Sequence, residues 1–242
     1  MRILYPDGSN DKSLTAFVYA SLREAILEGH FEPGEKLDQD KIADELKVSR
    51  TPIREALKML AVDGFIDIQS YRGAFIPLIN LQETLNIYEI RWIIEPEIVR
   101  QATPYIPEDV LTLCDYVLEQ ACRPDMVENE RHLLEMDEKF HSLIFQYCNN
   151  VILKEILENL NNRIVRVRTY ALHYTLGTQG HCHVEHDAIL SAIRARQAEQ
   201  AAHLMEKHLK ESAQRVCSKI GEGQNIQFPG GSGVLPMLTE LP

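Results

Sequence analysis

The segment VSRTPIREALKML, residues 48–60, constrains the fold most strongly, because its apolar and basic residues divide between two faces of one helix. Ile53, Leu57 and Leu60 recur at intervals of three and four residues and form the apolar face. The opposite face carries Arg50, Arg54 and Lys58. Such a helix packs into a small domain and presents cations outward, either to solvent or to a polyanion.

The surrounding sequence predicts two more helices and a hairpin. We expect helices near residues 14–28, 38–46 and 50–62, and short strands at 65–68 and 73–76. Gly29 ends the first helix, and the turn QSYR joins the two strands. Three helices followed by a β-hairpin predict a winged helix-turn-helix over residues 12–78.

After Pro77 the pattern becomes helical throughout, with no strand pattern. We expect helices near 81–102, 107–122, 126–148, 150–175, 184–195 and 198–219. The chain is therefore expected to be mainly α, with an all-α bundle over residues 79–220. Residues 221–242 are rich in glycine and proline and are expected to form a flexible tail.

The net charge of −11 argues against a general polyanion-binding protein, so charge has to be examined locally. Within residues 47–58 four basic residues face one acidic residue, which concentrates positive charge on the third helix. The sequence has no run of 18 apolar residues and no signal-peptide pattern, and its five cysteines are scattered. We therefore expect a cytoplasmic protein with reduced thiols and no membrane partner.

The basic helix and the hairpin supply candidate DNA contacts. Arg50 and Arg54 can bind guanine edges or phosphates in the major groove, and Lys58 continues their face. Thr51 lies at the helix N-terminus, where phosphate is favoured. Arg72 and Gly73 lie at the hairpin tip, which could reach the minor groove. A solvated basic face on another kind of small domain remains the alternative.

The stretch HCHVEHDAIL, residues 181–190, is dense in metal ligands, but only His186 has the register of an apolar helix face. Asp137 and His141 are four residues apart on another helix, and His208 lies on an apolar stripe of a third. These four side chains could converge in a bundle core. The alternatives are hydrogen-bonded core histidines and a local Asp137–His141 pair.

The first domain resembles the GntR family of bacterial transcriptional regulators. The resemblance rests on LDQDKIADELKVS, SRTPIREAL and RGAFI. It implies that Arg50, Thr51, Arg54 and Gly73 match DNA-contacting positions. The chain departs from the family pattern at Asp40, where relatives often carry a basic residue.

Residues 81–220 resemble the FCD effector domain of the FadR subfamily, through IYEIRWIIEPEIV, MDEKFHSLI and VEHDAILSAIRARQAEQAAHLMEKHL. The resemblance implies that Asp137, His141, His186 and His208 bind a divalent metal, which could be zinc, nickel, manganese or iron. It also implies that Arg91 faces a cavity and pairs with a small organic acid. The alternative is a surface arginine, or one paired with Glu95 four residues later on the same helix. Further candidates for binding the effector are Arg163, Arg166 and, outside the principal set, Arg168.

Two functions follow from these features. The first is a ligand-responsive repressor or activator, with repression favoured, that binds a palindromic operator in double-stranded DNA as a homodimer. Its effector could be a sugar acid, dicarboxylate, hydroxy acid or fatty acid. The second is a metal-dependent enzyme with an accessory DNA-binding-like domain, for which Glu185 is a weak candidate base. No HExxH or comparable catalytic motif occurs, so we expect a regulator and not an enzyme.

Overall fold

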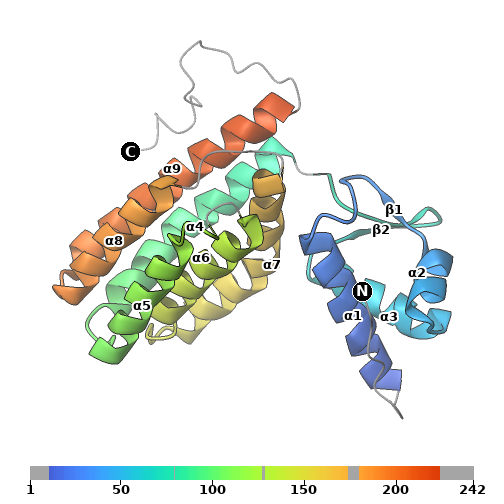
Figure 1. Cartoon of the computed structure of the whole chain (residues 1–242), viewed down its shortest axis with the longest axis horizontal. Coiled ribbons are helices and arrows are strands. Elements are labelled where there is room, and N and C mark those ends of the chain that lie inside the picture. The colour runs from blue at the N-terminus through green and yellow to red at the C-terminus, as the bar shows by residue number, and fades with distance from the viewer. Residues whose placement is uncertain (1–10, 79, 127–128, 174–179, 224–242) are drawn as a thin grey trace. The chain divides into compact units, whose positions relative to one another are not determined.

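The computed structural model describes residues 11–78, 80–126, 129–173 and 180–223 (Figure 1). The chain divides into two compact units, Met1–Leu78 and Ile79–Pro242. Of the predicted tail, residues 221–223 continue the last helix, and residues 224–242 lie outside the described residues.

The first unit has the predicted winged helix-turn-helix fold. Its helices are α1 (Asp11–Leu27), α2 (Gln39–Leu46) and α3 (Arg50–Val62), and its strands are β1 (Lys36–Leu37), β2 (Asp67–Gln69) and β3 (Gly73–Phe75). The strands form an antiparallel sheet in the order β1-β3-β2. The two-residue strand β1 was not predicted, and it pairs Lys36 with Phe75 and Leu37 with Ala74.

Helix periodicity explains how this unit buries its core. Along α1, Val18, Leu22 and Ile26 follow one another at four-residue spacing and are buried. The apolar face predicted for α3 is confirmed, because Ile53, Leu57 and Leu60 are all buried. The helix α3 therefore turns its basic face outward.

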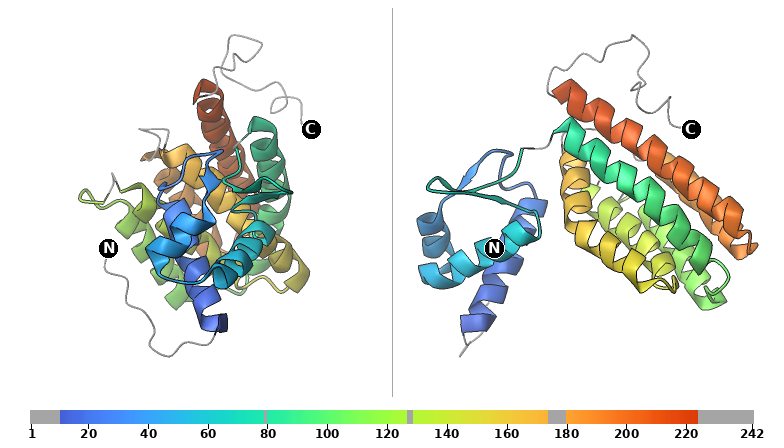
Figure 2. Two further views of the ribbon diagram at one scale, coloured as in Figure 1. Left: turned by 90° about the vertical axis from the view of Figure 1, so that its right-hand side faces the viewer. Right: turned by 180° about the vertical axis from the view of Figure 1, so that it is seen from behind.

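The second unit is the predicted helical bundle (Figure 2). Its helices are α4 (Leu81–Ala102), α5 (Glu108–Ala121), α6 (Glu130–Phe145), α7 (Val151–His173), α8 (Gly180–Arg194) and α9 (Ala198–Gly223). The helix α8 includes Gly180, whereas the predicted helix began at residue 184. His181, Cys182 and His183 therefore lie within α8 and not before it. None of the described helices combines the length and apolar character that crossing a membrane requires.

Helix packing in this bundle places the candidate ligands near its centre. The helices α4 and α9 run side by side, α8 packs on α9, and α6 contacts α4, α5 and α7 (Figure 1). Phe140 and Ile144 of α6 share one apolar core with Ile189 of α8 and Met205 of α9. Polar residues one turn away on the same helices are therefore drawn inward with them.

Candidate functional site

The candidate DNA-binding residues of α3 lie on the outer surface of the first unit. The side chains of Arg50, Thr51, Arg54 and Lys58 are all exposed. Ser49 occupies the N-cap position in an extended conformation, but its side chain makes no capping hydrogen bond. The amide groups of the first turn are thus not occupied by the side chain of Ser49, which leaves them for an anion.

Two of these cations already have carboxylate partners. Arg50 Nε lies 2.7 Å from Asp40 Oδ1, and Lys58 Nζ lies 2.7 Å from Glu55 Oε1. Asp40, where the chain departs from the family pattern, is therefore ion-paired with Arg50, one of the predicted DNA contacts. Arg54 forms no ion pair within the described part of the chain. Unlike Arg50 and Lys58, it therefore has no carboxylate partner there to give up on binding DNA.

The wing tip is shaped by its backbone. Gly73 has a φ of +111°, and a Cβ atom there would lie 3.1 Å from Lys36 Cε. The guanidinium of Arg72 lies over the ring of Phe75, 5.6 Å from its centroid. Arg72 thus lies at the surface of the wing tip. The backbone conformation of the next residue, Gly73, is one that favours glycine.

The structure brings all four predicted metal ligands together. Asp137 and His141 come from α6, His186 from α8 and His208 from α9, and one ligand atom from each lies within 4.8 Å of the other three. His186 Nε2 lies 3.3 Å from His208 Nε2 and 3.6 Å from Asp137 Oδ1. His141 Nε2 lies 3.8 Å from Asp137 Oδ2. The Nε2 atoms of His141 and His186 thus lie near the carboxylate of Asp137, and the Nε2 atom of His208 lies against that of His186.

Two further carboxylates stand behind the histidines. Glu185 Oε2 lies 2.6 Å from His208 Nδ1, and Arg215 donates two hydrogen bonds to Glu185, at 2.8 Å and 3.0 Å. Glu95 Oε2 lies 3.1 Å from His141 Nδ1, and Arg91 Nε donates to Glu95 Oε1 at 2.6 Å. The 3.1 Å approach is poorly aligned, so both ring nitrogens of His141 lack a well-formed hydrogen bond.

Buried polar atoms without partners are the reason that these residues fit a cation. His141, His186 and His208 are each less than a tenth exposed. An unpaired buried donor or acceptor costs about 1–3 kcal/mol. A divalent ion among the three Nε2 atoms and Asp137 would satisfy these groups, and this ligand set suits zinc, nickel, manganese or iron.

The ionisation states also suit a metal. Burial lowers the pKa of His186 well below its usual value, and the neighbouring His208 lowers it further. Burial likewise lowers the pKa of His208, although the hydrogen bond that His208 donates to Glu185 opposes this. Burial alone would raise the pKa of Asp137, but the charge of Arg168, which also donates a hydrogen bond to it, holds it well below the usual value. His186 and His208 are therefore neutral imidazoles and Asp137 is an ionised carboxylate, the forms that bind metal.

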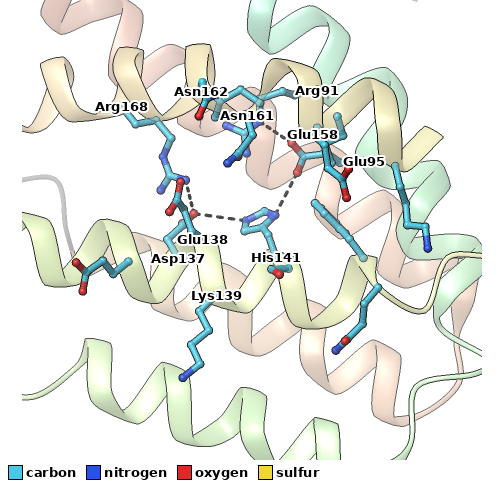
Figure 3. Close-up of a pocket in the computed structure, with 17 residues that line it drawn as sticks. Arg91, Glu95, Asp137, Glu138, Lys139, His141, Glu158, Asn161, Asn162 and Arg168 are labelled. Atoms are coloured by element: carbon cyan, nitrogen blue, oxygen red, sulfur yellow. Dashed lines mark hydrogen bonds and ion pairs between the residues drawn. The ribbon is translucent and has the colours of Figure 1, made fainter. Parts of the chain in front are cut away.

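A cavity of about 750 Å³ opens beside this cluster, between α4, α6 and α7 (Figure 3). Its wall includes Asp137 and His141, so the cavity and the cluster share two side chains. Arg91 and Arg168 also line it. Arg168 is ion-paired with Asp137, and Arg91 lies over the ring of Tyr88, 5.1 Å from its centroid.

The other predicted effector arginines do not lie at this cavity. Arg163 is exposed. Arg166 is buried, and its Nη2 donates to Glu83 Oε1 of α4 at 2.7 Å. The cavity lining therefore includes Arg91 and Arg168, but neither Arg163 nor Arg166.

Several site residues had no assigned role from the sequence. The sequence pattern indicated Glu95 only as a local partner of Arg91, and it did not mark Arg215, Asn161 or Asn162 at all. One signal was present: Arg215 follows His208 by seven residues, which places both on one face of α9. The Glu185 partner could not be inferred, because it comes from another helix.

Comparisons with known proteins agree with this architecture. Residues 14–76 match the family described as bacterial regulatory proteins, gntR family, and residues 86–211 match the FCD domain. The HTH-type transcriptional repressor RspR of Escherichia coli is 30% identical over 203 residues, covering 82% of this chain and 87% of that protein. The Nta operon transcriptional regulator of Aminobacter aminovorans is 28% identical over 192 residues, covering 79% and 89%.

Solved structures show the same arrangement of elements. A GntR transcriptional regulator from Rhodococcus sp. RHA1 matches with a TM-score of 0.71 and 25% identity, covering 84% of this chain and 97% of that chain. Escherichia coli McbR/YncC matches in fold with a TM-score of 0.69 and 21% identity, covering 82% and 94%.

Proposed function

Because the chain belongs to the GntR family and is a DNA-binding transcriptional regulator rather than an enzyme, we propose that it is a ligand-responsive repressor. In this proposal it belongs to the FadR subfamily, and its helical unit binds a divalent metal and a small organic acid. One observation carries the proposal: Asp137, His141, His186 and His208 converge beside a cavity that Arg91 lines.

Each ligand has a defined part in the proposed metal site. Asp137 supplies a carboxylate oxygen, and the three histidines supply Nε2 atoms from three helices. A bound divalent ion would act as a Lewis acid that accepts a carboxylate oxygen of the effector. Arg91 and Arg168, on the cavity wall, would orient the rest of the anion.

The cavity wall favours a small polar acid over a fatty acid. Its apolar side chains are Phe145, Leu157 and Ile164, and the other lining residues are charged or polar. Asn161 and Asn162 offer amide groups that can bind hydroxyl or carboxylate oxygens. An acyl chain buried against such a wall would leave many of these groups without partners.

The remaining parts of the proposal concern DNA. The exposed Arg50, Thr51, Arg54 and Lys58 of α3 would read the major groove, and Arg72 with Gly73 would reach the minor groove. One recognition helix reads a half-site, so a homodimer on a palindromic operator is expected. Repression is supported by relatives named as repressors, and the cytoplasm is where a bacterial chromosome is accessible.

Metal content tests the central observation. Purified wild-type protein should carry about one divalent ion per chain by elemental analysis, and His186→Ala and His208→Ala should lose it. His203→Ala is the matched control, since His203 is exposed on α9, the helix that carries His208. Equal metal content in wild type and both ligand variants would refute the assignment.

Operator binding tests the regulatory part. The protein should bind DNA from its own promoter region more tightly than random DNA, and Arg54→Ala should weaken this binding. A thermal-shift screen of organic acids with and without divalent metal should identify the effector. The repressor proposal fails if no sequence-selective binding occurs, with or without the acids that shift the melting temperature.

A further inference from the structure

Two arginine–glutamate pairs lie directly behind two of the candidate metal ligands. Arg215 holds Glu185 against His208, and Arg91 holds Glu95 against His141. We propose that Glu185 and Glu95 are positioning residues, which keep the proton of each imidazole on Nδ1 and direct the Nε2 lone pair at the ion. This inference rests on the proposed metal site.

The contact between Glu185 and His208 fixes the direction of the hydrogen bond. An ionised carboxylate can only accept, and Arg215 donates to both oxygens of Glu185, as it would to an ionised group. The 2.6 Å contact therefore requires a proton on His208 Nδ1. In a neutral imidazole the lone pair is then on Nε2, the atom that lies 3.3 Å from His186 Nε2.

The second pair has the same order of residues and a looser fit. Glu95 and Arg91 are both buried and joined by a hydrogen bond of 2.6 Å, and Glu95 Oε2 lies 3.1 Å from His141 Nδ1 without the alignment of a full hydrogen bond (Figure 3). Arg91 lines the cavity, whereas Arg215 does not. The pair of Arg91 and Glu95 thus lines the effector cavity, and the pair of Arg215 and Glu185 does not.

The third histidine is held differently. The ring of His186 stacks on Phe140, with the centroids 4.4 Å apart and the planes at 28°. This contact orients the ring but does not determine which of its two nitrogens carries the proton, because a phenyl face offers no strong hydrogen-bond acceptor. Control of the proton position is therefore concentrated on His208 and His141.

The position of the proton matters because the wrong tautomer presents an N–H to the ion and cannot bind it. Removing a carboxylate behind a ligand histidine typically costs about 10–100-fold in metal affinity. Glu185→Gln is the cleaner test, since Glu185 is partly exposed while Glu95 is fully buried with Arg91. A glutamine amide can either accept from Nδ1 or donate to it, so it does not select one tautomer.

The first measurement reads the tautomer directly. The full chain, labelled with ¹⁵N-histidine and freed of metal by a chelator, is observed by long-range ¹H–¹⁵N NMR, with the His208 signals assigned by their loss in His208→Ala. In wild type, His208 should carry its proton on Nδ1. In Glu185→Gln the signals should show both tautomers or the reverse one.

The second measurement is zinc affinity by chelator competition. Glu185→Gln should bind zinc about 10–100-fold more weakly than wild type. Glu83→Gln is the matched control, because Glu83 also pairs with an arginine across helices, Arg166, but contacts none of the four ligands. Its zinc affinity should equal that of wild type.

The outcomes separate this inference from the proposed function. If Glu185→Gln leaves either the His208 tautomer or the zinc affinity unchanged while wild type binds zinc, only the positioning role is overturned. If Glu83→Gln weakens zinc binding as much as Glu185→Gln, the effect is one of bundle stability and the positioning role is again overturned. If wild type binds no zinc or other divalent ion, the metal site itself fails, and the inference with it.

Discussion

Breaking the buried pair between Arg91 and Glu95 should destabilise the helical unit more than any exposed ion pair would. The guanidinium and the carboxylate are only 4% and 2% exposed and lie 2.6 Å apart. Removing one partner of such a pair costs about 3–5 kcal/mol, because it leaves the other charge buried and uncompensated. We therefore expect Arg91→Met and Glu95→Gln each to lower the free energy of unfolding by several kcal/mol.

The acidity of Glu95 gives an independent magnitude. Burial alone would raise its pKa, but the charge of Arg91 and the contact with His141 together outweigh burial and lower the pKa from 4.5 to about 2. A difference of that size corresponds to about 3 kcal/mol of stabilisation. Since the folded-state pKa is depressed, this stabilisation is present above about pH 4.5 and is lost as pH falls toward 2.

Denaturant unfolding followed by the fluorescence of Trp92 is a suitable assay, because Trp92 is the only tryptophan of the chain and adjoins Arg91 on α4. Metal removal excludes the contribution of metal binding, and a single protein concentration keeps the contribution of association comparable between variants. The double variant Arg91→Met/Glu95→Gln should cost at least about 2 kcal/mol less than the two single costs added together. Single costs below about 1 kcal/mol, or additive costs, would refute the reasoning.

Three further results are expected. Burial lowers the pKa of His186 and His208, so the unfolded state takes up protons first as pH falls below about 6.5. The free energy of unfolding of the metal-free protein should therefore fall by up to about 1.4 kcal/mol per pH unit for each of the two histidines. A flat stability profile from pH 7 to 5 would contradict this. Arg54→Ala should weaken operator binding more than Lys58→Ala, because Lys58 is already paired with Glu55, and it should reduce the salt slope by about one; equal losses would contradict it. Gly73→Ala should destabilise the first unit by more than about 1 kcal/mol, since φ is +111°, and an unchanged melting temperature would argue against the wing-tip geometry.

Local periodicity predicted most of the helices, because the apolar residues of each helix face recur at regular intervals within one contiguous stretch of sequence. The core face of α3 is an example, with Ile53, Leu57 and Leu60 all buried as expected. The strand β1 was not foreseen, since two residues carry no period and are ordered only by pairing with β3.

The arginines of α7 show where sequence reasoning about the site ends. Arg163, Arg166 and Arg168 lie within six residues, and successive residues turn by about 100° around a helix. Arg166 therefore meets Glu83 of α4, while Arg168 meets Asp137 at the cavity. Which arginine faces which helix depends on how α7 is rotated in the bundle, and its own sequence does not specify that rotation.

Metal and acid should bind this protein interdependently. The cavity lining carries four cationic side chains, Arg91, Lys139, Lys154 and Arg168, and five carboxylates, Glu95, Glu135, Asp137, Glu138 and Glu158. Its formal charge is thus −1 without metal, which disfavours an anion, and a divalent ion at Asp137 and His141 would reverse the sign.

We therefore expect chelation to abolish the thermal shift that the acid produces. Coupling is reciprocal in equilibrium binding, so the acid should raise metal affinity by the same factor as the metal raises acid affinity. Both factors can be measured, by titrating the acid at fixed metal and by chelator competition at fixed acid. An acid that binds equally well with and without metal would mean that the ion does not take part in acid binding and that the arginines alone hold the anion.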